Sequence, residues 1–228
     1  MKELSLLIKF PSRERKTQFF TVLNRAQRLR MRTNTRFLIT LDSNDASMNN
    51  DQVRHVMDMW GNLKYIYGES KGKVDAINRD MEQAEDFDIL LLLSDDMVPM
   101  VQGYDRIIVE QFEKNFPDTD GVLWLNDGYV GNRLNTIVCM GRKYYERFSF
   151  IYDNDYKSLF CDNEFTDISV KLNKYVYISQ ILIEHIHPMN VRTTPMDGLY
   201  RRNDKYFLED QITYKRRKAN NFYLEQYS

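Results

Sequence analysis

Cysteine is almost absent from this chain, and the few cysteines present exclude several kinds of site. Only Cys139 and Cys161 occur among the 228 residues, and they form no CxxC pair. A CxxC-based zinc or redox centre is therefore excluded. With so few thiols and no cysteine framework, we expect a reduced, cytoplasmic setting.

The chain also lacks a long apolar run, an excess of charge of one sign and a glycine-rich phosphate loop. No run approaches the length that spans a membrane. The first 15 residues hold too short an apolar segment for a secretory signal and no small-residue cleavage site. A net charge of −1 gives no support for nucleic-acid or membrane binding. No GxxxxGK[ST] motif occurs, which excludes a P-loop NTPase.

What the sequence does contain is apolar material in a regular alternation. Hydrophobic residues make up 43% of the chain and aromatic residues 13%, which is ample for a packed core. Short apolar runs alternate with segments whose apolar residues recur at helical spacing. We predict strands at 4–10, 36–41, 63–67 and 89–93, separated by helices over 19–30, 53–60 and 74–84. This order predicts an α/β fold with a mainly parallel sheet flanked by helices.

The second half of the chain is less regular. We predict two strands, at 121–125 and 135–140, around a glycine-containing loop. A further strand is predicted at 175–183, running into the sequence EHIHP. After Pro188 the chain becomes polar, so residues 192–204 are predicted to form a loop and 205–227 a terminal helix or extension.

Polar groups occur where the predicted strands end, and ligands bind at the carboxyl ends of strands in such sheets. Asp95 and Asp96 follow five large apolar residues and Ser94. A turn or helix cap explains such a pair, because aspartate favours both. Alternatively, one carboxylate binds a hard divalent cation and the other takes a ligand hydroxyl. Asp42 ends its strand in the same way, either as a loop residue or as an acceptor for a nucleotide base or ribose.

Two of the three histidines, His185 and His187, lie two residues apart, so on a strand they would share a side. They are either polar residues at a strand end or metal ligands; imidazole beside aspartate suits Mn²⁺ better than Ca²⁺. Asp162 and Glu164 are either acids that favour a helix start or candidates for a general base.

Basic residues follow the first and third predicted strands. Arg13 comes directly after the first strand, within a basic segment that forms a solvated face or reaches an anion. Lys71 and Lys73 flank Gly72 at a predicted helix start, where backbone N–H groups also favour anions.

In this order the features resemble the GT-A-fold nucleotide-diphospho-sugar transferases, most closely the family 2 glycosyltransferases. The resemblance covers residues 1–190 and is carried by six segments: LLIKFPSRER, LITLD, KGKVDAINRDM, LLLLSDDMVP, CDNEFTDIS and IEHIHP. The SDD sequence departs from a strict DxD motif, and the base region lacks a clean Glu-Asp pair.

The resemblance implies a role for each part of the site. Asp42 would contact the base or ribose and Asp95 the ribose, while Asp96 would bind Mn²⁺ or Mg²⁺ with His187 or His185. Asp162 or Glu164 would deprotonate the acceptor hydroxyl. The remaining nucleotide-binding residues implied are Pro11, Ser12, Arg13, Lys73, Asn78 and Ser94.

The implied enzyme is a hexosyltransferase that moves a sugar, with inversion, from a UDP-sugar to a hydroxyl acceptor. Residues 1–100 would form the nucleotide half and 101–190 the acceptor half of one domain. Residues 191–228 would form a C-terminal tail. Within it, the turn-rich segment TTPMDGLYRRNDKYF is predicted to order as a lid over bound donor, with Arg192, Arg201 or Arg202 near the phosphates.

Three other functions remain open at this point. A sugar-phosphate nucleotidyltransferase usually carries a glycine-rich loop after its first strand, which FPSRERK lacks. A metal-dependent hydrolase built on Asp95, Asp96, His185 and His187 predicts two metals and no nucleotide affinity. A non-catalytic binding module on the same fold would bind carbohydrate or a protein.

Overall fold

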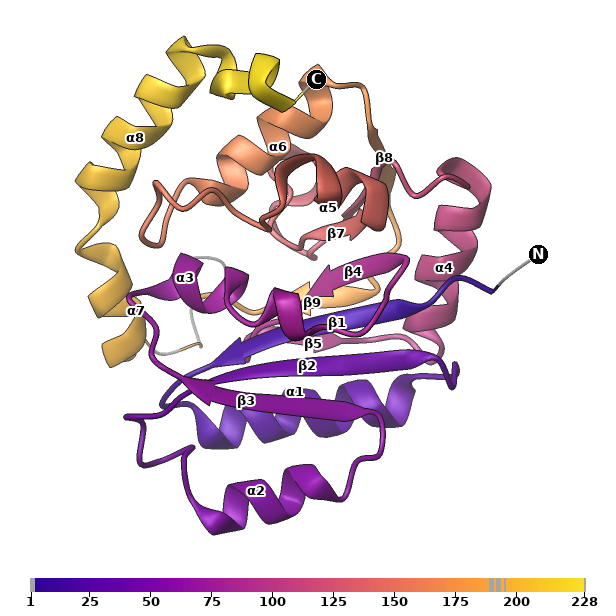
Figure 1. Ribbon diagram of the computed structural model, residues 1–228, viewed down its shortest axis with the longest axis vertical. Coiled ribbons are helices and arrows are strands. Elements are labelled where there is room, and N and C mark those ends of the chain that lie inside the picture. Colours follow the sequence, from indigo (N-terminus) through magenta and orange to yellow (C-terminus); the bar gives the residue numbers. More distant parts are fainter. Residues whose placement is uncertain (1–2, 189–190, 192–193, 195, 228) are drawn as a thin grey trace.

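A seven-stranded sheet forms the centre of the molecule in the computed structural model, which describes residues 3–227 except 189, 190, 192, 193 and 195 (Figure 1). Its order is β3-β2-β1-β4-β7-β6-β8. All neighbouring strands run parallel except at β7, which is antiparallel to both β4 and β6. The strands are β1 (Leu6–Ser12), β2 (Thr35–Asp42), β3 (Leu63–Gly68), β4 (Ile89–Leu92), β6 (Val122–Leu125), β7 (Cys139–Gly141) and β8 (Tyr175–Ile178).

Helices cover both faces of this sheet, and each face has its own apolar core (Figure 1). One core packs under α1 (Lys16–Leu29), α2 (Asp51–Asp58) and α4 (Tyr104–Asn115). The other packs under α3 (Lys73–Asn78), α5 (Arg142–Phe148) and α6 (Cys161–Lys171). The predicted α/β fold with a mixed, mainly parallel sheet is thereby confirmed.

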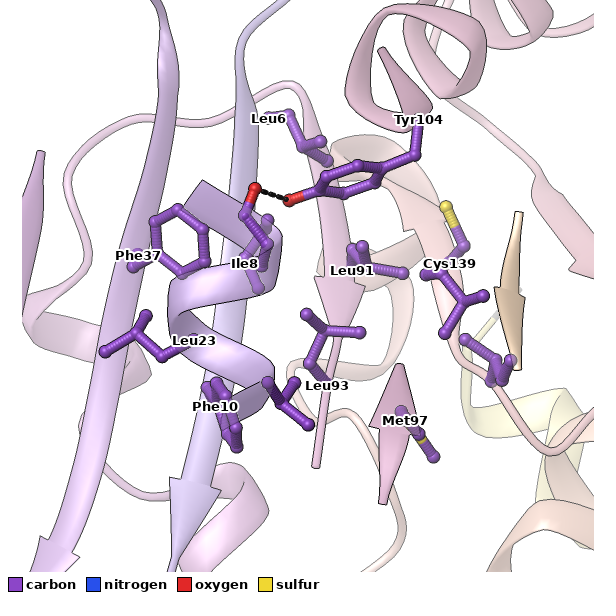
Figure 2. Packing of buried hydrophobic residues seen from close by; sticks show 14 of the residues in the cluster. Leu6, Ile8, Phe10, Leu23, Phe37, Leu91, Leu93, Met97, Tyr104 and Cys139 are labelled. Atoms are coloured by element: carbon purple, nitrogen blue, oxygen red, sulfur yellow. Dashed lines mark hydrogen bonds between the residues drawn. The ribbon is translucent and has the colours of Figure 1, made fainter. Parts of the chain in front are cut away.

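Strand β1 shows how the sequence builds these two cores. Its alternate residues Leu6, Ile8 and Phe10 are fully buried under α1, while Leu7 joins the opposite core. Tyr104 of α4 lies over the first of these cores, and its hydroxyl donates to the carbonyl of Ala26 at 3.3 Å (Figure 2). A strand buried on both faces reads as a near-continuous apolar run, as observed here.

Three predicted elements differ from the structure. The predicted strand at 175–183 ends at Ile178, and Ile183–His185 forms a separate strand, β9. This strand pairs antiparallel with β5 (Met97–Pro99), a pairing that buries Ile183 beside Met97. The predicted strand at 135–140 reduces to Cys139–Gly141, because the backbone N–H of Asn135 bonds to the side chain of Thr166 instead of a strand.

The helix predicted over 74–84 is the third difference. It stops at Asn78, and a 3-10 helix resumes at Met81–Gln83. Between them Asp80 has a positive φ of 70°. The Nζ of the buried Lys9 donates a hydrogen bond to the carbonyl oxygen of Arg79 at 2.5 Å. A side-chain donor thus satisfies a carbonyl that continued helix would have used.

The C-terminal segment is more ordered than predicted. Gly198–Asp204, expected as loop, is helix α7, while α8 (Phe207–Ala219) confirms the terminal helix and a 3-10 helix follows at Asn221–Tyr227. Helix α8 packs against α6. Among the described helices, none is long and apolar enough to cross a membrane.

Candidate active site

The carboxyl ends of β1, β2 and β4 bring four predicted residues to one edge of the sheet. Parallel pairing places Ser12 opposite Leu41, so the ends of β1 and β2 lie side by side and Asp42 follows directly. Strand β4 pairs with the other edge of β1 and leads into Asp95 and Asp96. The Ser12 hydroxyl donates to Asp95 Oδ2 at 3.0 Å, which joins the two strand ends.

Asp95 is buried and its main partner is Arg15, at the entrance to α1. The Arg15 Nη1 group donates to Asp95 Oδ1 at 2.8 Å. Burial nevertheless raises the pKa of Asp95 to about 6, because the loss of water outweighs the attraction of Arg15 and Asp96 adds a like charge. Asp95 is therefore mostly ionised at neutral pH, and each of its two oxygens accepts a hydrogen bond.

Asp96 is also buried and has a different set of partners. Ser94 donates to Oδ1, Tyr200 of α7 donates to Oδ2 at 2.6 Å, and His185 Nε2 lies 3.6 Å from Oδ1. Burial opposes ionisation, but the contacts with His185, Ser94 and Tyr200 outweigh it and hold the pKa of Asp96 well below its usual range. Asp96 is therefore a permanent anion.

His185 reaches Asp96 because the ladder between β5 and β9 places Met97 opposite His185. The ring of His187 lies 5.7 Å from that of His185 and 4.7 Å from that of Tyr200. His185 ends β9, so strand alternation does not extend to His187, although both rings lie in the same region. Burial, with a contribution from His185, lowers the pKa of His187 to about 4, which keeps this imidazole neutral at pH 7.

Asp42 closes the opposite end of the site. Arg13 Nη1 donates to its Oδ2 at 2.5 Å, and Arg79 Nη1 lies 3.6 Å from its Oδ1. That Oδ1 is buried and accepts no hydrogen bond from the described residues. Pro11, on β1 opposite Thr40, is half-buried beside this end of the sheet.

Lys73 and Asn78, both on α3, have different surroundings. Lys73 starts the helix and is close enough to Asp162 to stabilise its charge. Asn78 instead binds the loop after α5: its oxygen accepts from the backbone of Ile151 and Tyr152, and its nitrogen donates to the Tyr152 carbonyl. The structure thus gives the Asn78 amide a role in holding that loop, since backbone groups occupy both of its ends.

Asp162 and Glu164, in the first turn of α6, face different parts of the molecule. Burial raises the pKa of Asp162, and the charges of Lys73 and His185 partly offset that rise, so Asp162 lies on the side of the candidate metal residues. Glu164 accepts from both Nε and Nη2 of Arg217, at 2.8 and 2.9 Å, and from the Tyr156 hydroxyl at 2.7 Å. A carboxylate whose two oxygens are paired in this way is poorly placed to take a proton from a substrate.

Three residues of the site were not predicted from the sequence. Arg15 lies within the basic segment after β1, but nothing distinguished it from its neighbours. Asp197 caps α7 by accepting from the backbone of Leu199 and Tyr200, a helix-start pattern that the sequence MDGLY carries. Tyr200 had no signal, because it meets Asp96 across 104 residues of chain.

The residues present fit a hard or borderline divalent cation. Asp96 supplies an ionised oxygen, and His185 Nε2 lies 3.6 Å from its Oδ1. An imidazole nitrogen beside a carboxylate oxygen suits Mn²⁺. Within the described part of the chain, no three His, Cys, Asp or Glu residues are grouped to hold a metal alone, so a ligand would have to supply further donors.

Solved structures with this fold were found by comparison, whereas no protein family and no curated protein matches the sequence. The mannosyltransferase PcManGT from Pyrobaculum calidifontis, in complex with GDP-Man and Mn²⁺, superposes with a TM-score of 0.60 at 13% identity over 79% of this chain. Residues 1–349 of S. aureus TarS, in complex with UDP-GlcNAc, superpose with a TM-score of 0.62 at 15% identity over 79%.

These similarities confirm the GT-A type of fold. The chain spans 56% of the PcManGT chain and 58% of the TarS chain, so each of those proteins has a large part without a counterpart here.

Proposed function

We propose that the protein is a metal-dependent glycosyltransferase that moves a sugar from a nucleotide-sugar to an acceptor hydroxyl. The observation that carries the proposal is that Asp42, Asp95 and Asp96 follow strands that end at one carboxyl edge of the sheet, with His185 beside Asp96. Two solved structures with this fold hold GDP-Man with Mn²⁺ or UDP-GlcNAc, respectively.

The nucleoside fits the end of the site around Asp42. The Oδ1 atom of Asp42 is buried and accepts no hydrogen bond from the described residues, with only the Arg79 guanidinium at 3.6 Å, so we assign it as an acceptor for an N–H group of the base. Pro11, Ser12 and Arg13 line the same strand end, and we assign them to the base and ribose. Asp95 would accept from a ribose hydroxyl. Uracil is the first base to test.

A bound Mn²⁺ or Mg²⁺ would stabilise negative charge on the departing diphosphate as a Lewis acid. Asp96 would hold it, with His185 or His187 as the second protein ligand. Ser94 orients Asp96 by donating to its Oδ1. Lys73, at the start of α3, adds a positive charge on the same side.

Asp162 is the residue that we assign as general base. Its raised pKa makes it a better proton acceptor than an exposed aspartate, while Glu164 is held by Arg217. A base that acts from the face opposite the leaving group gives inversion at the anomeric carbon, as in inverting glycoside chemistry. Single displacement with inversion is therefore the mechanism proposed.

Nucleotide-induced thermal stabilisation tests this function. We expect UDP or GDP to raise the melting temperature only with Mn²⁺, since a ligand at about 100 times its Kd stabilises by about 2.7 kcal/mol. Asp96→Asn should remove the Mn²⁺-dependent part of the shift. Asp51→Asn, an equal change at an exposed position of α2, should keep it.

The rival functions predict other results in the same experiment. A two-metal hydrolase would be stabilised by Mn²⁺ alone and indifferent to nucleotide. A binding module without donor recognition would respond to neither. Full nucleotide stabilisation of Asp96→Asn would refute the metal assignment.

A further inference from the structure

Helix α7 and its N-cap Asp197 reach the Asp95–Asp96 pair in two ways, directly at Asp96 and through Arg15 at Asp95. Tyr200 donates its hydroxyl to Asp96 Oδ2 at 2.6 Å. Asp197 accepts from Arg15 twice, from Nε at 2.7 Å and from Nη2 at 2.9 Å, while the third nitrogen of Arg15 donates to Asp95. The Arg15 guanidinium also stacks on the Tyr200 ring at 3.8 Å from its centre.

These contacts occupy the positions that a metal-bound diphosphate needs. The Tyr200 hydroxyl points its hydrogen at Asp96 Oδ2, where a cation bound to that oxygen would otherwise lie. Arg15 is a cation with planar donors suited to phosphate oxygens, yet the carboxylates of Asp95 and Asp197 take all three of its nitrogen groups. The arrangement supplies the buried acid pair with hydrogen bonds and one positive charge in place of a metal.

We infer that α7 is an autoinhibitory latch that the metal–diphosphate unit of the donor releases; the inference rests on the function proposed above. Asp96 would exchange the Tyr200 hydroxyl for a bound cation, and Arg15 would exchange Asp197 for the diphosphate. The two exchanges would be coupled, because Asp197 caps the short helix whose first turn holds Tyr200. Arg15 then becomes a diphosphate-binding residue.

This arrangement reverses the lid expected from the sequence. That lid was to order over a bound donor through arginines, whereas α7 already lies on the acid pair through Asp197 and Tyr200. Of the three arginines named for it, Arg202 pairs with Glu14 and Arg192 lies outside the described residues. Donor binding is therefore expected to free α7 from this position.

Tyr200→Phe tests the latch, because it keeps the ring that stacks on Arg15 and removes only the hydroxyl. We expect Mn²⁺–UDP to bind about tenfold more tightly by calorimetry, the effect of one charge-assisted hydrogen bond that no longer competes. Tyr214→Phe is the matched control. It removes a hydroxyl on α8 that donates to Asp167 of α6 at 2.7 Å, and it should leave the affinity for Mn²⁺–UDP unchanged. Equal or weaker binding by Tyr200→Phe would overturn the latch.

Asp197→Asn tests the contact between Asp197 and Arg15 separately from that of Tyr200 with Asp96. Asparagine still caps the helix, but it removes the charge that holds Arg15. Mn²⁺–UDP should then bind several-fold more tightly than to the wild type. An unchanged affinity would show that Arg15 does not reach the diphosphate, which contradicts the proposed exchange.

Limited proteolysis needs no ligand, so it distinguishes failure of the latch from failure of the proposed function. Trypsin should cut after Arg201 and Arg202, both exposed on α7, faster in Tyr200→Phe than in the wild type or Tyr214→Phe. An equal rate would overturn the latch alone. Faster cutting combined with no Mn²⁺–UDP binding by any variant would instead refute the glycosyltransferase assignment and donor release with it.

Discussion

Two clusters of acids in this molecule are each organised around one buried arginine, and they differ in how completely the groups beside them are hydrogen-bonded. At the strand ends, Arg15 joins Asp95 and Asp197. Between α6 and α8, Arg217 joins Glu164, Asp153 and Asp155. Both arginines are almost fully buried, so burial and charge alone do not distinguish the clusters.

The difference lies in the neighbouring groups. Both oxygens of Glu164 accept hydrogen bonds, and Tyr156 adds a third. At the strand ends, Asp42 Oδ1 and His185 Nδ1 are buried without hydrogen-bond partners among the described residues. A completed network holds elements together, whereas unmade hydrogen bonds at a sheet edge are free for a ligand. We therefore interpret the Arg217 cluster as structural and the Arg15 cluster as functional.

Removing one acid near each cluster is the strongest test of this contrast. Asp162→Asn should lower the rate of donor turnover about 10³-fold, within the range for loss of a general base. Glu164→Gln should lower it far less at a temperature where the variant is folded. Nucleoside diphosphate release is the measurement, and equal losses in both variants would remove the distinction between the two acids.

Replacing the arginine of the completed cluster should affect stability instead. Arg217→Met leaves Glu164 buried without its cation, which costs about 3 kcal/mol of unfolding free energy. The Kd for Mn²⁺–UDP should stay within about twofold, because Arg217 forms its ion pairs with Glu164, Asp153 and Asp155 and these acids are not assigned to the nucleotide. Denaturant unfolding measures the first quantity and calorimetry the second. A large loss of affinity in folded protein would contradict a purely structural role.

The pH dependence of folding stability tests the functional cluster, because it reports the pKa of Asp95. Its pKa is about 6 in the folded protein, above that of an unfolded aspartate, so folded protein binds this proton more tightly. The stabilisation is present below about pH 4 and is lost as the pH rises through 6. Asp95→Asn lacks it, so wild-type stability relative to this variant should fall by about 2 kcal/mol between pH 4 and pH 7. If denaturant unfolding gave the same difference in unfolding free energy between wild type and Asp95→Asn at pH 4 and pH 7, the pKa of Asp95 would not be raised.

The smallest effect is expected where α7 meets Glu14. Arg202 and Glu14 pair at 2.6 Å, but both side chains are more than 40% exposed, and such pairs contribute about 0.5 kcal/mol or less. Arg202→Ala should therefore leave both the melting temperature and the Mn²⁺–UDP affinity nearly unchanged. An increase in affinity matching that of Tyr200→Phe would place the latch in this exposed pair.

The sequence was sufficient for the strand-end residues because parallel strands bring their carboxyl ends to one edge. Asp42, Asp95 and Ser12 follow from that rule and from the positions of apolar runs. His185 was found as a candidate, but its contact with Asp96 depends on pairing between β5 and β9, two three-residue strands with little pattern of their own.

The remaining parts depend on contacts between distant segments. Arg217 meets Glu164 across 53 residues and Asp197 meets Arg15 across 182, and no local periodicity reports such pairs. Asn78 shows the reverse problem. Its place in a motif-like segment suggested a ligand, while its amide geometry suits the backbone of a neighbouring loop.

The ladder between β5 and β9 sets limits on how this site can be altered by insertion or deletion. Side chains alternate along a strand, so one residue inserted between Ile183 and His185 would turn the imidazole to the opposite side of the ladder. The same insertion in the four-residue connection before β9 could be absorbed without changing register. Engineered insertions should therefore be placed at residues 179–181, because Leu182 is fully buried, and should leave the three pairs of the ladder intact.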